Sequence, residues 1–411
     1  MPISRVSSRS SLARPNICRF KVVRHVREAF ACRACEQVVQ APARHHAVPR
    51  GRAGPGLLAH IAVAKFDDHL PLYRQTEIYA RDGMDLATST LSGWLGATAA
   101  TLTPLVDLLR REVIAGSAVL HGDDTPIPVL APGTGKTRTG RLWTYLRDER
   151  PHGGTRPPAA VFFASPDRRS ERSLAHLAGF SGVLLADGYA GFNGLYGKTR
   201  PGGALTEAAC RTHVRRKIFD VHAATGSALA AEALARIGAL YGIDRELPGN
   251  PPDARTRERQ ARAKPLAAAL KAWAERSLTQ LPGRSELAKA LRYMLTRWPA
   301  RTRAFDDGCI ALDNNAAEWA PRGVAVGRKN YLFAGSDLGG RARGRLLHPD
   351  RDGQAEPARS RGLPARHAHT HRRSPGQAAD QSAPLELDAR PAGCARRLTK
   401  RPITDFLLPT S

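Results

Sequence analysis

Three acidic residues stand where their carboxylates could share a divalent cation. Asp123 follows an apolar run in HGDDTPIPV, Asp187 follows another in LLADGYAGF, and Glu318 closes DNNAAE. Neighbouring carboxylates repel one another unless a cation lies between them, and Mg²⁺ or Mn²⁺ prefers oxygen ligands. One acid after a strand is more often a turn cap, but three in a basic chain favour a metal site.

A pair of such ions would support phosphodiester chemistry. One ion would activate water or a DNA 3′ hydroxyl, and the other would stabilise the leaving oxygen. The GRKN segment that follows Glu318 supplies Arg328, Lys329 and Asn330. We expect these side chains to contact the phosphates that lie across the metal site.

The composition agrees with a polyanionic partner. The chain has 411 residues, more than one core usually encloses, and its 63 Lys and Arg against 37 Asp and Glu give a net charge of +26. DNA is the first candidate for that partner, although a genome rich in Arg codons would give the same bias. The six cysteines do not form a disulfide framework. Without an apolar run of about 20 residues or a signal peptide, we expect a soluble, cytoplasmic, nucleoid-associated protein.

The acids need a scaffold, and the hydrophobic pattern predicts one. Four apolar runs, at residues 117–123, 141–148, 159–166 and 182–188, read as strands. The first three would form hairpins, and a helical crossover would then place the fourth strand beside the first. This arrangement brings Asp123 and Asp187 to one spot. The predicted fold class is α/β, with a mixed sheet and flanking helices in a domain over 113–340 and a helical insertion at about 225–300.

Two smaller regions precede this domain. Residues 1–19 lack a pattern, and residues 20–56 hold Cys32 and Cys35, half of a zinc knuckle that only Cys18, His45 or His46 could complete. Zinc binding there is therefore a weak prediction. Residues 57–112 are helical and have the size of a helix-turn-helix around Gly83, with Thr88 or Ser89 as the cap of its second helix. Its second helix would present Ser89, Thr90, Ser92 and Trp94 to DNA, and the alternative is an ordinary helical hairpin.

One motif gives a negative result. GTGKT suggests a phosphate-binding loop, but the G-x4-G-K-T pattern needs Gly where Leu130 stands. The segment is predicted to be a basic hairpin turn.

A series of longer motifs carries a resemblance. HGDDTPIPVL, GRLWTYLRD, LLADGYAGFNGLY, CRTHVRRKIFD and DNNAAE with GRKNYLFAGS resemble, in this order, the IS66 family of insertion-sequence transposases. The resemblance covers about residues 20–340 and implies a ribonuclease-H-like core whose DDE triad is Asp123, Asp187 and Glu318. It implies DNA cleavage and strand transfer at element ends, a homo-oligomer on DNA, and accessory proteins of the same element. It also implies that the segment with Cys210, His213 and Arg216 supports the site or contacts DNA.

The chain departs from the family pattern in several places. Asp124 stands where Glu is usual, Trp319 replaces a cation, and Pro321 follows the third acid closely. The zipper-like segment and the earlier cysteine pair of the family are missing, which indicates a truncated copy. Residues 341–411 read like an out-of-frame translation, because shifted codons for DGQAEP and RHAHTHRRSP restore family-like strings. We expect a frameshift between about residues 336 and 350, and the alternative is a natural basic tail.

These departures leave two other functions open. The chain could be a non-catalytic DNA-binding remnant of a transposase, or a ribonuclease-H-like nuclease that cuts DNA without joining it.

Overall fold

The computed structural model describes residues 3–6, 19–23, 25–32, 35, 37–43, 45–49, 51–327, 329–330, 332–346 and 398–400. The chain divides into two compact units. One comprises residues 1–57 and 356–411, and the other comprises residues 58–355. Among the described residues, no helix has the length and apolar character that crossing a membrane requires.

The first unit contains short antiparallel strands. β1 (Ile3–Val6) pairs with β2 (Arg19–Val22), so part of the region expected to lack structure forms a strand. β3 (Ala29–Cys32) pairs with β4 (Val38–Gln40) on one side and with β10 (Leu398–Lys400) on the other. The part of the expected frameshifted tail after Leu346 lies outside the described residues, apart from β10.

A helical region opens the second unit. It contains α1 (Pro55–Phe66), α2 (Leu72–Arg81), α3 (Thr88–Thr101) and α4 (Thr103–Ala115). The expected break at Gly83 is present, and its φ of 81° lies in the left-handed region that glycine tolerates best. The N-cap of α3 is Ala87, however, and not Thr88 or Ser89.

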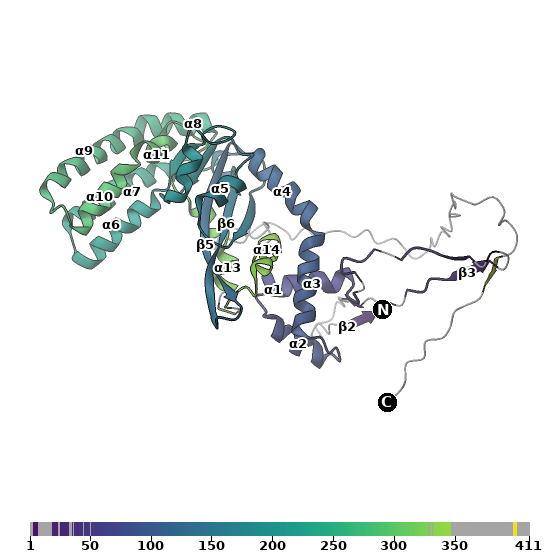
Figure 1. Ribbon diagram of the computed structural model, residues 1–411. Coiled ribbons are helices and arrows are strands. Elements are labelled where there is room, and N and C mark those ends of the chain that lie inside the picture. Colours follow the sequence, from purple (N-terminus) through teal and green to yellow (C-terminus); the bar gives the residue numbers. More distant parts are fainter. Residues whose placement is uncertain are drawn as a thin grey trace, which may run out of the picture. The chain divides into compact units, whose positions relative to one another are not determined.

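A five-stranded mixed sheet forms the centre of this unit (Figure 1). Its order is β7-β6-β5-β8-β9, with bounds β5 (Val119–Ala131), β6 (Lys136–Arg147), β7 (Ala159–Ser165), β8 (Val183–Ala186) and β9 (Thr206–Ala209). β6 pairs antiparallel with both β5 and β7, whereas β8 pairs parallel with β5 and β9. The mixed α/β sheet with flanking helices confirms the predicted fold class, including the placement of the fourth strand beside the first.

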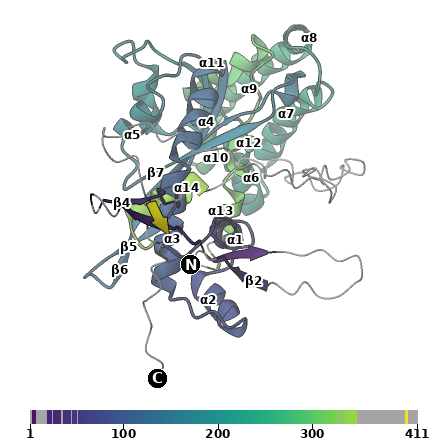
Figure 2. The ribbon, with the colours of Figure 1, turned by 90° about the vertical axis from the view of Figure 1, so that its right-hand side faces the viewer.

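Side chains alternate between two cores, one on each face of the sheet. In β6, Trp143 and Tyr145 lie in the core formed with α4, α5 (Ser170–His176) and η2 (Ala190–Tyr196). Leu142 and Leu146 lie in the opposite core, which includes Val324 of α13 (Arg322–Gly327). Figure 2 shows α4 passing across the sheet, where it contacts β6 and β7. Both faces of the sheet are thus covered, as in α/β proteins generally.

The predicted helical insertion is present. It contains α6 (Thr212–Thr225), α7 (Ala228–Asp244), α8 (Pro252–Glu258), η3 (Arg259–Ala263), α9 (Lys264–Gln280) and α10 (Glu286–Thr296). These helices share a large apolar core and extend beyond one end of the sheet (Figure 1). α11 (Trp298–Thr302) and η4 (Arg303–Phe305) lead back, and α12 (Asn315–Trp319) follows. The last helix of the described residues, α14 (Asp337–Leu346), contacts β7 and α3. It extends beyond residue 340, where the domain was expected to end and the tail to begin.

Two strand predictions were wrong in detail. β5 does not end at Asp123 but continues to Ala131, although it contains Pro126 and Pro128. β8 pairs with β5 only as far as Gly122. Prolines are tolerated beyond that point because β8 needs no N–H from β5 there. β9 was also missed, since its sequence TEAA lies within a stretch of helical composition.

Candidate active site

Asp123 and Asp187 lie on neighbouring strands at matching positions. The parallel register of β5 and β8 ends with the pair Gly122 and Ala186. Asp123 is the next residue of β5, and Asp187 is the first residue after β8. Side chains alternate along β5, so Asp123 leaves the sheet on one face. The two acids thus lie at the same end of neighbouring strands, and that their carboxylates share one ion stays a prediction.

Asp124 points to the other face and has different partners. Its side chain is 2% exposed and accepts hydrogen bonds from Arg168, whose Nη2 lies 2.6 Å from Oδ1. Arg168 Nε adds contacts of 2.9 Å to both carboxylate oxygens, and Arg141 Nη1 lies 3.1 Å from Oδ2. Asp124 is therefore the counter-ion of two arginines, and Asp123 is the acid left free to face the third carboxylate.

Arg168 also links this ion pair to the second acid. Its Nη2 lies 4.0 Å from Oδ2 of Asp187, and its guanidinium stacks 3.5 Å from the ring centre of Tyr189. The Tyr189 hydroxyl donates to the Arg168 carbonyl, and the Tyr189 N–H donates to Asp187 Oδ1 at 3.1 Å. Sequence reasoning missed Arg168, although the SPDRRSE segment after a predicted strand was a signal that could have been followed.

Asn314 fixes the start of the helix that carries Glu318. Asn314 is fully buried, and its Nδ2 donates to the Gly122 carbonyl at 2.8 Å while its Oδ1 lies 3.1 Å from His121 Nδ1. Its backbone N–H donates to Cys210 Sγ at 3.2 Å. The same residue thus joins β5, the end of β9 and the first turn of α12. Burial raises the pKa of the Cys210 thiol to about 11.

Glu318 has two basic neighbours on α6. Oε1 lies 3.8 Å from His213 Nδ1, and Oε2 lies 3.6 Å from Arg216 Nη2. Arg216 is 57% exposed, so its contact with Glu318 is weakly held. The CRTHVRR segment is therefore beside the third acid, as a supporting or DNA-contacting segment should be.

The helix break after Glu318 explains how Pro321 is accommodated. α12 ends at Trp319 and α13 begins at Arg322, so Pro321 precedes a new helix instead of interrupting one. A proline at the start of a helix lacks only an N–H that would have no intrahelical partner. Trp319 is 52% exposed beside Glu318.

The electrostatics of Asp123 show that the acids act on one another. Burial, followed by the charges of Asp124, Asp187 and Glu318, raises the Asp123 pKa to about 7. Asp187 and Glu318 thus both lie within electrostatic reach of Asp123, and the buried Oε1 of Glu318 has no hydrogen-bond partner. Carboxylate oxygens are the donors that suit Mg²⁺ or Mn²⁺. The residue types therefore fit such an ion.

The basic segment after Glu318 is held against the sheet. Ala334 forms a parallel bridge with Val129, and it exchanges hydrogen bonds with the Pro128 carbonyl and the Leu130 N–H. This bridge occupies the edge of β5 that β8 leaves open. Lys329 and Asn330 are exposed, although Asn330 Nδ2 donates to the His69 carbonyl at 3.1 Å. Arg328 lies outside the described residues.

The helix-turn-helix residues separate into two groups. Ser89 is exposed and Thr90 half-buried on α3, so both can be reached from solvent. Trp94 is only 8% exposed and belongs to the core of the helical region. The structure thus leaves the beginning of α3 as the accessible part, with Ser92 also exposed.

The zinc knuckle expected at Cys32 and Cys35 stays a prediction. Cys35 is exposed, and Cys18 and the Cys32 side chain lie outside what the structure describes. His25 and His46 contact each other edge to face at 6.0 Å. Within the described residues, the one group of three metal-binding side chains is Cys210, His213 and Glu318.

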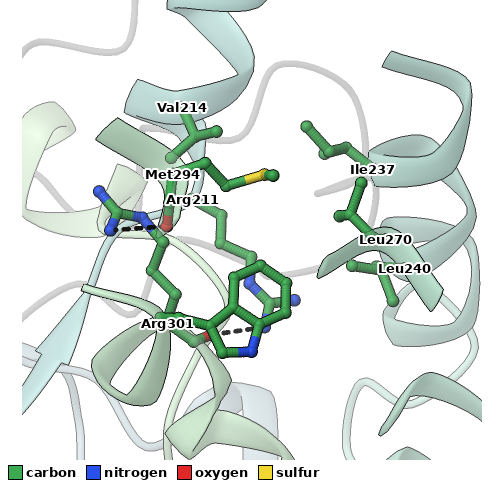
Figure 3. Close-up of a pocket in the computed structure, with 8 residues that line it drawn as sticks. Arg211, Val214, Ile237, Leu240, Leu270, Met294 and Arg301 are labelled. Carbon is green, nitrogen blue, oxygen red and sulfur yellow. Dashed lines mark hydrogen bonds between the residues drawn. The ribbon is translucent and has the colours of Figure 1, made fainter. Parts of the chain in front are cut away.

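Two pockets among the described residues differ in size and in their distance from the acids. An open pocket of about 580 Å³ lies beside Asp187, and it is lined by Arg168, Arg169, Ser170, Glu171, Tyr189, Ala190 and Gly191. A pocket of about 20 Å³ lies in the helical insertion between Arg211, Arg301 and apolar side chains (Figure 3). It has room for about one water, and none of the three acids lines it. Burial lowers the pKa of Arg211 there to about 10.

Comparison with known proteins gives the family. The family model described as "Transposase IS66 family" matches residues 50–342. The chain belongs to the IS66 transposase family. This match contains all three acids of the site, whereas Cys32 and Cys35 precede it.

Curated relatives of this IS66-family chain come from Sinorhizobium fredii. The uncharacterized protein y4hP is 43% identical over 333 residues, which cover 78% of this chain and 60% of the relative. The uncharacterized proteins y4qI and y4jD are each 39% identical, and the matches cover 79% of this chain with 60% and 64% of the relatives. The chain thus spans less than two thirds of the length of these relatives.

Proposed function

We propose that this IS66-family transposase cleaves DNA at the ends of its element and transfers the cut strand, using divalent metal ions held by Asp123, Asp187 and Glu318. One observation carries the proposal. Asp123 and Asp187 directly follow the last paired residues of two neighbouring strands, and the charges of Asp187 and Glu318 both raise the Asp123 pKa. Buried carboxylates with this mutual repulsion are costly unless they bind a cation.

The ions, when bound, would supply Lewis acidity for hydrolysis and strand transfer. The chain supplies position and counter-charge. Asn314 holds the helix of Glu318 against β5, and Arg168 pairs with Asp124 and lies 4.0 Å from Asp187. Arg216 lies 3.6 Å from Glu318, so a bound ion would compete with two arginines for these carboxylates.

Exposed cationic side chains around this site would hold DNA phosphates. Arg168 and Arg169 line the open pocket beside Asp187, and Arg169 is 77% exposed. Lys329 and Arg216 add exposed positive charge near α12. Contacts of this kind hold the backbone in register without reading its sequence. Reading the element ends would fall to other residues, and Ser89 and Thr90 on α3 are the accessible candidates.

A nicking assay tests the proposal. A labelled duplex with the ends of the element is incubated with Mg²⁺ or Mn²⁺ and either the unaltered protein or Asp187→Asn. We expect cation-dependent nicking that falls by about 100-fold or more in the variant, since the substitution removes a metal ligand. Asp85→Asn, which changes an exposed acid on the loop before α3, is the matched control and should retain full activity.

The rival function is DNA binding without catalysis. It is favoured by Trp319, an exposed aromatic residue where the family resemblance implies a cation. End binding without nicking, unchanged by Asp187→Asn, would support the rival and overturn the catalytic proposal. Nicking without strand joining would instead indicate a ribonuclease-H-like nuclease.

A further inference from the structure

Cys210, His213 and Glu318 form a compact group of unlike ligands beside the carboxylate site. One ligand atom from each residue lies within 4.8 Å of the other two. Sulfur, imidazole nitrogen and a single carboxylate oxygen form a donor set that suits Zn²⁺ far better than Mg²⁺. We propose that these three residues bind a soft divalent cation such as Zn²⁺, which takes Glu318 away from the oxygen-rich site.

The ligand atoms are available for this role. His213 Nδ1 and Glu318 Oε1 are both buried without a hydrogen-bond partner, and they face each other at 3.8 Å. A buried polar atom without a partner is costly, so two of them in contact indicate a missing third atom. A cation between them would satisfy both.

The third ligand, Cys210, already accepts a hydrogen bond of the kind found at metal-bound sulfur. Cys210 Sγ accepts the Asn314 N–H at 3.2 Å, and hydrogen bonds to sulfur are a common outer contact of metal-bound thiolates. Cys210 directly follows β9 and His213 belongs to the first turn of α6, so the two ligands lie at one strand-to-helix junction. Glu318 comes to them on α12, whose start is held by the same Asn314.

The size of the group is close to what zinc requires. Tetrahedral zinc with bonds of about 2.0–2.3 Å places its ligands roughly 3.3–3.8 Å apart. The His213 to Glu318 distance of 3.8 Å already meets this spacing. No two of the three ligand atoms are more than 4.8 Å apart, so they must approach by about 1 Å to bind zinc. A rotation of the half-buried side chains can supply this movement. A water molecule would complete the four ligands.

One residue competes with the cation. Arg216 Nη2 lies 3.6 Å from Glu318 Oε2, and its positive charge opposes a divalent ion at the same carboxylate. Because Arg216 is largely exposed, it can turn into solvent when the ion binds. Removing its charge should therefore tighten binding instead of weakening it.

The test uses Co²⁺ as a spectroscopic substitute for Zn²⁺ in the full-length chain. Cys32→Ser and Cys35→Ser are introduced in every sample, so that the N-terminal cysteine pair gives no signal. We expect a thiolate-to-cobalt absorption band, displaced by Zn²⁺, that disappears in Cys210→Ser. Cys309→Ser removes another free cysteine of the same unit and should leave the band unchanged. A band that persists in Cys210→Ser, or no band in the parent protein, would overturn the proposal.

Two further variants test the same site without relying on the buried cysteine. His213→Gln should weaken Zn²⁺ binding by about tenfold or more, and Arg216→Ala should strengthen it. Circular dichroism checks that each variant is folded. Equal Zn²⁺ affinity in all of these proteins would refute the site.

The functional consequence rests on the proposed catalytic role of Glu318. Micromolar Zn²⁺ should inhibit Mg²⁺-dependent nicking in the parent protein and should inhibit His213→Gln less. Zinc binding is measured separately from nicking, so a protein that never nicks DNA can still bind Zn²⁺ at this site. A protein that nicks DNA but gives no cobalt band would refute the zinc site alone.

Discussion

Asp123 and Asp187 each directly follow the last residue pair, Gly122 and Ala186, that joins β5 to β8. The Asp123 carboxyl is buried, and burial together with the charges of neighbouring acids raises its pKa to about 7. Nearby residues set this cost of ionisation, hold a partner acid in place or bring DNA to the site.

Asp123→Asn should stabilise the metal-free protein at pH 8 and change little at pH 4. The folded-state pKa lies above the unfolded value near 3.8, so the native state binds the proton more tightly. Stability from this group is therefore present at low pH and lost as the pH rises from about 4 to 7. The effect reaches at most about 4 kcal/mol at pH 8, measured by urea unfolding in chelator. Mg²⁺ should stabilise the unaltered protein more than the variant, and equal stabilisation would count against Asp123 as a ligand.

Arg168→Ala should destabilise the fold by about 2–4 kcal/mol, because it leaves the nearly buried Asp124 with only Arg141 as counter-ion. Arg169→Ala is the matched control and should cost less than about 0.5 kcal/mol, since Arg169 is largely exposed. Adding Asp124→Asn to Arg168→Ala should recover much of the loss, because no unpaired charge then remains. Additive losses in the double variant would show that the pair is not energetically coupled.

Asn314→Ala should lower both stability and nicking. The substitution removes hydrogen bonds to Gly122 and His121 from a fully buried position, a loss of about 1–3 kcal/mol. It also frees the start of α12, so Glu318 is no longer held near Asp123. Asn315→Ala changes the next residue, whose backbone N–H donates to Asp313 Oδ1 and is kept in the variant, and should leave nicking unchanged. Thermal unfolding and the nicking assay measure the two effects separately, and full activity in Asn314→Ala would contradict the positioning role.

Trp319→Arg should increase DNA affinity and make it more sensitive to salt. The side chain is exposed beside Glu318, so an arginine there can reach a phosphate without rearranging the core. One additional phosphate contact steepens the dependence of log affinity on log salt by about 1. Trp319→Gln, which removes the aromatic ring without adding charge, is the control. Identical salt dependence in the two variants would place residue 319 away from DNA.

The sequence was informative about the sheet and about two of the acids. Apolar runs and the crossover rule predicted that the strands before Asp123 and Asp187 are neighbours, because local pattern and connection handedness suffice for that inference. The prolines after Asp124 made the rest of β5 hard to predict, because a strand tolerates them there only if β8 has already ended. The four residues of β9 contain neither a long apolar run nor alternation.

The surroundings of the acids were harder to predict. Arg168 lies in a charged segment, and such segments usually form a solvated surface. Asn314 looks like a helix cap in sequence, but its side chain bonds with residues from a distant strand. Neither role can be read locally, because each depends on a tertiary contact. The burial of Trp94 also depends on tertiary contacts, since only the packing of the helical region decides which face of α3 is covered.

The contact between His121 and Asn314 joins residues that are 193 positions apart in the chain. Strands β5 to β7 are connected by hairpins and can pair as soon as they leave the ribosome, whereas α12 is synthesised after the whole helical insertion. Contacts across such long loops form late in folding. On the proposed mechanism, a nascent chain therefore carries two of its acids through most of translation without being able to cut DNA. A premature stop codon before residue 314 would give a fragment that retains the sheet and is harmless to the genome that encodes it.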